Sequence, residues 1–332
     1  MKISELKDFL NKIVDSPEHI PLMIWSGPGI GKSSAVRQVA NENGFNFIDL
    51  RLSLLNPVDL RGLPMVNREQ NTSQWLPPEF LPNKKHGEKG ILFLDEINLA
   101  PASVMAAGYQ LILDRKLGEY TLPQQWKVIA AGNRSEDNAN VTKFPSPLAN
   151  RFVHIDIESD EKVWRKWAIN SGISEQIIAF LGKFPQHLYK FPKAGEKVFP
   201  TPRSWEMASR LLSVGLDVEN AVGEGVASEF KAFLNVYKKL PDIDSILAGK
   251  DKKVPKDLDV LWALSMALVT RSEPKDIPAI INYSEGMPKE FEVITIINLS
   301  DKSKKHEHAL LNSKEWSVWI ENNKEIIENE NK

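Results

Sequence analysis

The sequence predicts an α/β fold: a parallel five-stranded sheet covered by helices, followed by an all-helical region. Short apolar runs alternate with helical patterns over residues 1–157, which is the order expected of strands joined by helical crossovers. One of these runs, Pro21–Trp25, leads directly into a glycine-rich loop that opens a helix. After Ser159 the strand patterns fade while helical patterns continue. We therefore expect an α/β core and a separate helical part.

The expected strands of the core are its short apolar runs, at residues 22–25, 46–52, 90–95, 126–131 and 152–157. Its helices are expected at 3–14, 32–43 and 101–116. The last of these has Pro101 near its start and Gly118 after its end, the usual asymmetry of helix termini.

The segment from Ser53 to Gly90 is too long to be a simple connection. Within it, Leu63–Val66 and Ser73–Leu76 flank a polar turn, which predicts an inserted hairpin. A second hairpin is expected between Leu117 and Trp126.

Beyond the core, helical spacing of apolar residues predicts helices at 160–171, 174–184, 203–214, 224–239 and 257–271. Lys250–Lys256 has the composition of a linker, and Phe291–Ile297 fits either a strand or a buried helix. We predict a core over 1–157, a helical domain over 158–250 and a mainly helical extension over 251–332.

The composition of the chain is that of a globular protein without a membrane span. The 332 residues are 42% apolar and 26% charged, and no apolar run is long enough to cross a bilayer. The N-terminus lacks a signal-peptide core, and cysteine is absent, which excludes disulfides and thiolate metal sites. The net charge of −2 gives no overall attraction to nucleic acid, although it does not exclude a local basic patch on the surface. A cytoplasmic protein with no membrane contact is expected.

The glycine-rich loop has the chemistry of a triphosphate cradle. Residues 26–34 read Ser-Gly-Pro-Gly-Ile-Gly-Lys-Ser-Ser, and their glycines allow several backbone amides to face one anion at a helix start. Lys32 supplies a charge for the β- and γ-phosphates, and the Ser33 hydroxyl can ligate Mg²⁺. Ser26 replaces the first glycine of the general pattern, and a glycine-rich turn without ligand is the alternative. The predicted nucleotide-binding residues of the loop are Gly27, Pro28, Gly29, Ile30, Gly31, Lys32, Ser33 and Ser34.

Polar side chains follow two further apolar runs. Asp95 and Glu96 end the run that starts at Gly90, in the position where open α/β sheets bind ligands. Asp95 can hold Mg²⁺ and Glu96 can activate a water, whereas the alternative is two solvated acids. Asn133 follows the run Val128–Gly132 and can bond the same water or the γ-phosphate, or it can simply cap a turn.

In this order the motifs resemble those of the AAA+ ATPases. The resemblance covers about residues 1–240: Walker A at 26–33, Walker B at 92–96, sensor 1 at Asn133, an arginine finger at Arg151 and sensor 2 at Arg203. Asn56–Gly62 with the hairpin behind it, and Pro145–Phe152, look most like the MoxR branch and its helix-2-insert relatives.

This resemblance implies a Mg²⁺-dependent ATPase with an α/β core and a helical lid. Lys32 and Ser33 would hold phosphate and Mg²⁺, Asp95 would organise the metal, Glu96 would polarise water and Asn133 would sense the γ-phosphate. Arg203 would touch the nucleotide of its own subunit, and Arg151 would act in trans on a neighbour's site. It further implies a homo-oligomeric ring, usually a hexamer, and a client or partner protein such as one with a von Willebrand factor A domain.

Three functions are compatible with these residues. The first is a MoxR-like remodelling ATPase of chaperone type; the second is a nucleic-acid-associated AAA+ motor or loader; the third is a nucleotide-gated scaffold with little turnover. Two other signals point to structure. The sequence favours a solvated surface for His306 and His308, and core packing for tryptophans at helical spacing.

Overall fold

The computed structural model describes residues 1–69, 71–134, 149–191 and 196–323. Contacts within the chain divide it into two compact units, Met1–Asp160 and Glu161–Lys332. Each unit is described by itself below. Among the described residues, the longest apolar helices are too short to cross a membrane.

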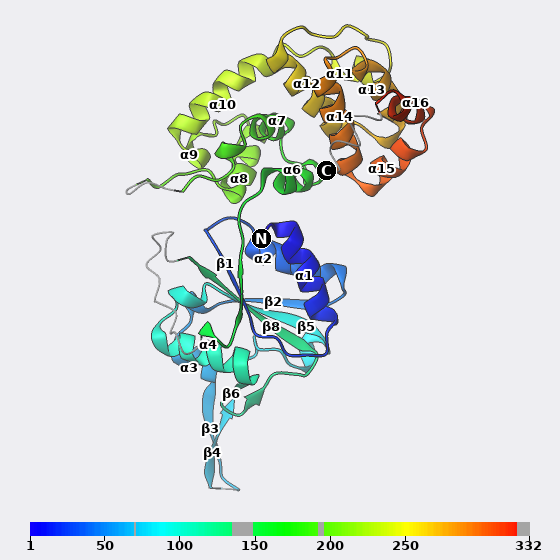
Figure 1. Ribbon diagram of the computed structural model, residues 1–332. Helices are drawn as coiled ribbons and strands as arrows, with labels where there is room; N and C mark the ends of the chain where they lie inside the picture. Colours follow the sequence, from blue (N-terminus) through cyan, green and yellow to red (C-terminus); the bar gives the residue numbers. More distant parts are fainter. Residues whose placement is uncertain (70, 135–148, 192–195, 324–332) are drawn as a thin grey trace. The chain divides into compact units, whose positions relative to one another are not determined.

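The first unit is built on a five-stranded parallel sheet with the strand order β2-β5-β8-β1-β9 (Figure 1). Its central strands are apolar along almost their whole length because helices bury them on both faces. The predicted strands and their parallel arrangement are confirmed. The strands are β1 (Leu22–Ser26), β2 (Asn46–Arg51), β5 (Gly90–Asp95), β8 (Trp126–Asn133) and β9 (Val153–Asp156).

Helices lie on both faces of this sheet. Figure 1 shows α1 (Ile3–Asp15) and α2 (Lys32–Glu42) on one side of the strands and α4 (Ala102–Asp114) on the other. The α4 side chains Val104 and Leu111 share a buried cluster with Leu92 and Val128 of the strands. Alternate residues of each strand face the two helical layers, so one apolar run serves both cores. Shorter elements connect these layers: η1 (Leu52–Leu54), α3 (Pro57–Arg61), η2 (Lys84–His86) and η3 (Ile97–Leu99).

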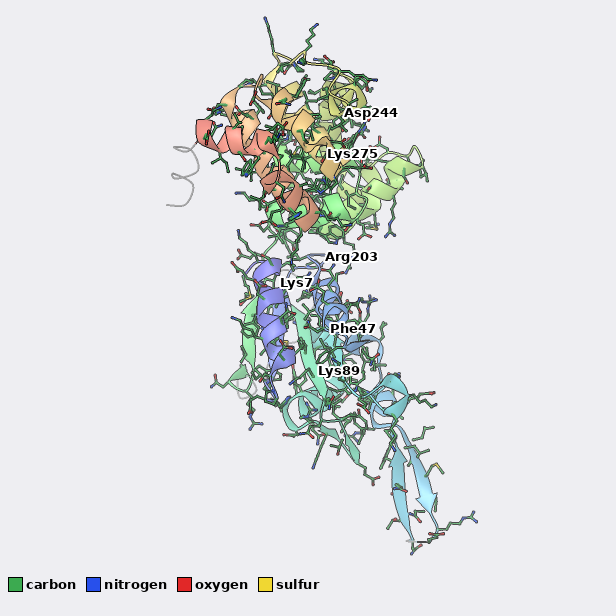
Figure 2. All side chains as sticks on the ribbon, turned by 90° about the vertical axis from the view of Figure 1, so that its right-hand side faces the viewer. Lys7, Phe47, Lys89, Arg203, Asp244 and Lys275 are labelled. Atoms are coloured by element: carbon green, nitrogen blue, oxygen red, sulfur yellow. The ribbon has the colours of Figure 1, made fainter. Side chains whose placement is uncertain are left out.

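The inserted hairpin consists of β3 (Leu63–Asn67) and β4 (Thr72–Leu76), paired antiparallel. The chain enters it at Gly62, which has φ 84° and where an added Cβ would lie 1.8 Å from the Leu76 carbonyl oxygen. Figure 2 shows its side chains standing clear of the sheet, and five large apolar ones are exposed: Leu63, Met65, Val66, Trp75 and Leu76. A short second hairpin joins β6 (Lys116–Leu117) to β7 (Tyr120–Thr121).

In the described residues of the second unit, the regular secondary structure is helical. Together with the sheet of the first unit, this confirms the predicted fold class. The helices are α6 (Glu161–Asn170), α7 (Glu175–Lys183), η5 (Pro185–His187), α8 (Pro202–Ser213), α9 (Glu219–Val222), α10 (Glu224–Tyr237), α11 (Ile243–Leu247), α12 (Leu258–Arg271), η6 (Pro274–Asp276), α13 (Ile277–Ser284), α14 (Lys289–Lys302), α15 (Lys304–Leu311) and α16 (Lys314–Asn322).

One hydrophobic core of this unit extends along the chain from Trp164 to Phe291. Side chains on both sides of the linker Lys250–Lys256 therefore pack together. The division into a domain over 158–250 and an extension over 251–332 stays a prediction. Of the tryptophans expected in the core, Trp164, Trp205 and Trp319 are buried. Three more are partly buried and pack against the hydrophobic clusters: Trp167, Trp262 and Trp316.

In this unit the structure resolves one ambiguous prediction and contradicts another. Phe291–Ile297, ambiguous in sequence, lies within helix α14. The prediction of a solvated surface is wrong for His306, whose side chain is only 6% exposed. Its ring nitrogens lie 2.8 Å from the Ser303 hydroxyl and 3.1 Å from the Ser272 carbonyl oxygen, and burial lowers its pKa. The histidine thus helps to fix the start of α15.

Candidate functional site

The glycine-rich loop connects β1 to α2 in a conformation that side chains disfavour. Gly29 has φ 75° and Gly31 has φ 110°, both in the left-handed range that glycine adopts without strain. Ile30 between them is buried and anchors the loop to the core. Helix α2 begins at Lys32, so its unpaired backbone amides and positive dipole end face the loop. This arrangement suits an anion such as a phosphate group.

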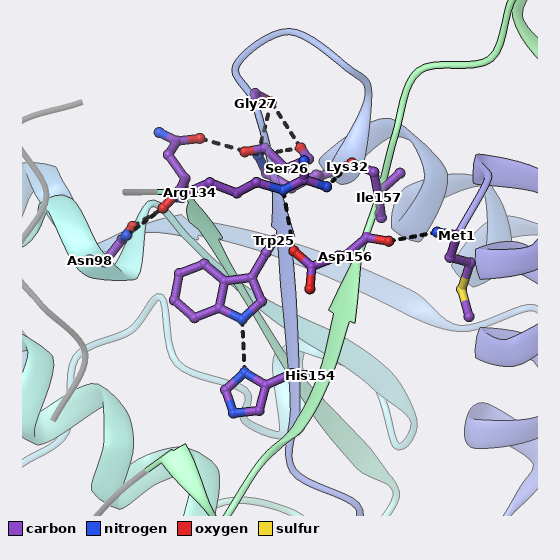
Figure 3. A network of polar contacts seen from close by, with 11 residues as sticks. Met1, Trp25, Ser26, Gly27, Lys32, Asn98, Arg134, His154, Asp156 and Ile157 are labelled. Carbon is purple, nitrogen blue, oxygen red and sulfur yellow. Dashed lines mark hydrogen bonds and ion pairs between the residues drawn. The ribbon is translucent and has the colours of Figure 1, made fainter. Parts of the chain in front are cut away.

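The Lys32 ammonium occupies the centre of the site. Its side chain is only 9% exposed. Nζ lies 2.9 Å from the Ser26 hydroxyl, 3.2 Å from Asn133 Oδ1 and 3.3 Å from the Ser26 carbonyl oxygen (Figure 3). A buried cation is costly unless polar groups surround it, and these oxygens supply that environment. The ammonium is thereby held in place in front of the loop.

Ser26, where the general pattern has glycine, has a structural explanation. Its buried hydroxyl donates to the Gly27 carbonyl oxygen at 2.8 Å and accepts from Lys32 Nζ. The departure from the pattern thus adds a partner for the lysine and leaves Gly29 and Gly31 to provide the unusual backbone turns.

Two carboxylates follow the neighbouring strand β5. Asp95 Oδ1 accepts from the Glu96 backbone amide at 2.9 Å, and burial raises the pKa of Asp95 while the Lys32 charge opposes that shift. Glu96 has φ 54°, in the left-handed region where a residue with a side chain is strained. Its Oε2 accepts from the Ser53 hydroxyl at 2.6 Å. Glu96 is therefore aimed by both its backbone and Ser53.

Asn133 ends β8, next to Ser26 in the pairing of β8 with β1. Its side-chain oxygen contacts Lys32 Nζ, and its backbone contacts the side chain of Asn98 (Figure 3). The following residue, Arg134, lies 3.2 Å from the Asp156 carboxylate and donates to the Ile157 carbonyl oxygen at 2.8 Å. The ends of β1, β8 and β9 are thus tied together around the lysine.

The predicted Mg²⁺ ligands have suitable chemistry. Ser33 is the second residue of α2, and Asp95 is a half-buried carboxylate whose charge is only partly offset by Lys32. Hydroxyl and carboxylate oxygens are the donors that a hard divalent cation takes, usually with waters and phosphate oxygens completing its shell. These two residues fit a nucleotide-bound Mg²⁺, and their assignment as ligands stays a prediction.

The two predicted arginines are placed differently from the other site residues. Arg151 is exposed, just before β9, and it forms no hydrogen bond or ion pair with another described residue. Arg203 is exposed at the second position of α8, in the second unit. The motif segment Pro145–Phe152 lies outside the described residues up to position 148. The roles of both arginines stay predictions.

Sequence reasoning missed three residues that the structure adds to the site: Ser53, Asn98 and Arg134. Ser53 sits in η1, far along the chain from Glu96, so no local pattern connects them. Asn98 could have been recognised in the sequence, because it is a lone polar residue between the apolar Ile97 and Leu99, two positions after Glu96. Arg134 follows Asn133 directly and was overlooked beside it.

Replacing Asp95 with asparagine is expected to raise the melting temperature of the nucleotide-free protein at neutral pH. Burial raises the Asp95 pKa, so the folded state binds this proton more tightly than the unfolded state. The ionised carboxylate therefore costs stability above the ordinary carboxyl range, and that cost disappears as the pH falls below it. Asparagine keeps the oxygen that accepts from Glu96.

The measurement is the melting temperature of both proteins between about pH 3.5 and 8, which brackets the ordinary carboxyl range. The advantage of Asp95→Asn should shrink towards low pH. Asp8→Asn is the control, since it removes an exposed carboxylate from the same unit. A variant that melts below the unsubstituted protein at every pH would contradict the inferred burial cost.

Comparison with known proteins identifies the first unit. Residues 22–158 match the model of the ATPase family associated with various cellular activities (AAA). The chain is 24% identical to Midasin from Dictyostelium discoideum over 204 residues, which are 57% of this chain and 3% of that protein. Over 147 residues, 42% of this chain and 3% of the relative, it is 25% identical to Midasin from Giardia intestinalis.

The chain thus spans about 3% of the length of the curated relatives that it matches. Among solved structures, NtrX from Brucella abortus in complex with ADP is similar at 14% identity and a TM-score of 0.42, over 97% of this chain and 67% of that one. The family match covers β1 with the loop behind it, β5 with its two acids, and β8 with Asn133. Residues 22–158 of this chain therefore carry the match to the AAA ATPase family domain, in agreement with the P-loop fold of the first unit.

Proposed function

We propose that the chain is a Mg²⁺-dependent ATPase of the MoxR-like AAA+ type, which works as an oligomeric ring on a protein partner. One observation carries the proposal most directly. The buried Lys32 ammonium contacts Asn133 Oδ1 at 3.2 Å, and the neighbouring strand β5 ends at Asp95, with Glu96 directly after it. Cation, amide and two carboxylates on adjacent strand ends are the set that phosphoryl transfer to water requires.

In this proposal each residue has one task. Lys32 and the loop amides bind the β- and γ-phosphates of ATP. Ser33 and Asp95 would hold Mg²⁺, whose charge would offset that of the phosphates. Glu96 accepts a proton from the attacking water. The new bond joins that water oxygen to the γ-phosphorus, while the bond to the bridging oxygen breaks and leaves ADP. Asn133 orients the water or a γ-phosphate oxygen.

The exposed Arg151 supports the proposed ring. A cation that stabilises the transition state must reach the γ-phosphate, and Arg151 has no partner among the described residues of its own chain. We propose that it completes the site of a neighbouring subunit, with a hexamer as the expected ring. Arg203, in the second unit, would contact the nucleotide of its own subunit.

The partner would contact the hairpin β3–β4. Val66 is 76% exposed and Leu63 66% exposed, on a hairpin that projects from the sheet. Exposed apolar side chains gathered on one projection favour contact with a protein. The proposed partner is a client protein, such as one with a von Willebrand factor A domain.

Glu96→Gln is expected to bind ATP normally and to hydrolyse it about 10²- to 10⁴-fold more slowly, the contribution of a general base. The matched control is Glu42→Gln at the exposed end of α2, whose carboxylate pairs with Lys7 at 3.2 Å. Steady-state phosphate release and ATP binding are measured for both. Unchanged turnover in Glu96→Gln would refute the role of Glu96, and an unsubstituted protein that never hydrolyses ATP would refute the ATPase proposal.

The same variant tests the partner. Held in its ATP state, the Glu96→Gln protein should retain a client protein that it releases when ATP is withdrawn. Replacing Val66 and Trp75 together by serine should abolish retention and leave hydrolysis unchanged in the chain that keeps Glu96. If the client protein is retained equally with and without ATP, or is still retained by the double variant, the hairpin does not provide the proposed client contact.

A further inference from the structure

Strand β8 extends further than its neighbour β5. The two strands pair in parallel up to Leu94 opposite Ala130, and β5 ends one residue later, where Glu96 turns the chain away. On its other side, β8 stays paired with β1 as far as Asn133 opposite Ser26. The last residues of β8 therefore need another partner on the β5 side.

The side chain of Asn98 takes that place. Its Nδ2 donates to the Asn133 carbonyl oxygen at 2.7 Å, and the Asn133 backbone amide donates to Asn98 Oδ1 at 3.1 Å (Figure 3). A side-chain amide carries the same donor and acceptor as a peptide group, so it can continue the ladder of the sheet. Asn98 is only 2% exposed, and its side-chain nitrogen and oxygen both form a hydrogen bond with the backbone of Asn133.

Gly132 makes room for this contact. A Cβ added at Gly132 would lie 2.8 Å from Asn98 Oδ1 and 2.8 Å from a ring carbon of Trp25. Contacts this short do not occur at real Cβ atoms, so any larger residue would displace the amide or the ring. Glycine at this position and asparagine at 98 thus form one fitted arrangement.

We propose that Asn98 is a positioning residue of the ATP-hydrolysis site. By fixing the Asn133 backbone it holds the Asn133 side-chain oxygen 3.2 Å from Lys32 Nζ. It also joins Asn133 to the turn that carries Glu96, two residues before it, so the two polar groups keep one relative position. Asn98 touches neither nucleotide nor water in this scheme. The inference rests on the proposed ATPase function and deepens it.

Asn98→Asp gives this role a distinctive pH profile. One carboxylate oxygen can still accept from the Asn133 amide, but the other faces the Asn133 carbonyl oxygen and repels it. When protonated, that oxygen can donate as the amide did. Because burial raises the pKa of the introduced carboxyl group, we expect the ratio of variant to unsubstituted kcat to rise as the pH falls from about 8 to about 6.

At the upper end of this range kcat should be about 10- to 100-fold lower, the usual loss when a group that orients another is removed. The Kd for ATP, measured directly, should change by less than about threefold, because Lys32 and the loop stay intact. Asn98→Leu, which has neither donor nor acceptor, should lose kcat to a similar extent with no dependence of the ratio on pH.

Asn43→Asp is the matched control in the same unit. Its amide also donates to a backbone carbonyl, that of Val39 at 2.8 Å, but at the far end of α2. It should lower the melting temperature without changing kcat. Gly132→Ala is the second variant if Asn98→Asp does not fold, and it should reduce kcat while Asn98 is still present.

The outcomes separate the two proposals. If the unsubstituted protein does not hydrolyse ATP, the proposed function itself fails. If it does hydrolyse ATP, any one of three results would show that Asn98 has no positioning role. The Asn98 variants could match the kcat of the unsubstituted protein, or lose kcat only in proportion to lost ATP binding. The ratio of kcat for Asn98→Asp to that of the unsubstituted protein could also stay constant across the pH range.

Discussion

Lys32→Met is expected to weaken ATP binding by at least roughly 30-fold. The ammonium is buried at the start of α2, and its surrounding oxygens, from Ser26, Gly27 and Asn133, are already arranged around it. Removing one partner of a buried charged contact costs about 2–5 kcal/mol, or roughly 30- to several-thousandfold in affinity. Methionine is an unbranched apolar side chain of similar length, and it removes the charge together with the N–H donors of the ammonium. Titration calorimetry with ATP and Mg²⁺ measures the effect.

Lys127→Met is an unusually close control. Lys127 lies in β8 of the same unit and is also 9% exposed. Its ammonium likewise donates to backbone carbonyls, those of Ser16 and Glu18. Both variants should lose stability, but only Lys32→Met should lose ATP binding. Equal affinities in the two variants would show that the loop is a structural turn and not the nucleotide site.

Arg151→Ala is expected to lower ATP turnover by about 10³- to 10⁵-fold while each chain still binds ATP. The side chain is exposed, and the binding residues Lys32, Ser33 and Asp95 belong to other elements. Arg210→Ala, an exposed arginine of α8 that pairs with Glu206, is the control and should leave turnover unchanged. The turnover per chain of the unsubstituted protein should also rise with protein concentration, because assembly completes the site.

Mixing two inactive proteins distinguishes action in trans from action within one chain. An Arg151→Ala subunit keeps its own Glu96, and a Glu96→Gln neighbour can supply Arg151 to it. Mixed assemblies should therefore recover part of the activity that each variant lacks alone. If mixed rings form and stay inactive, Arg151 does not complete a neighbour's site.

The core of the fold was predictable because its signals are local. A buried parallel strand reads as an unbroken apolar run, and β1, β5 and β8 each begin and end within two residues of their predicted bounds. The hairpin was equally visible, since Leu63–Val66 and Ser73–Leu76 flank a polar turn. Residues 251–332 were predicted to be mainly helical, but α13 to α16 were not predicted one by one. Phe291–Ile297, which lies in α14, was left open between strand and buried helix because its apolar run is compatible with both.

The residues of the candidate site also differ in whether a local sequence pattern marks them. Lys32, Asp95, Glu96 and Asn133 each follow an apolar run, so a motif marks them. The contacts of Ser53 and Asn98 depend on strand register and on where β5 turns away, which no local pattern encodes. His306 was misjudged for a similar reason: its polar neighbours in sequence suggest a surface, whereas its ring packs against Ser272 from a distant turn.

The left-handed backbone of Glu96 has a practical consequence for engineering this protein. A residue with a side chain in that conformation costs about 1–3 kcal/mol, and glycine or asparagine would relieve part of it. A library selected only for heat resistance would therefore enrich substitutions at position 96 that discard the carboxylate. Selection for survival at high temperature would run against turnover at this position, so variants of this chain need to be scored for both at once.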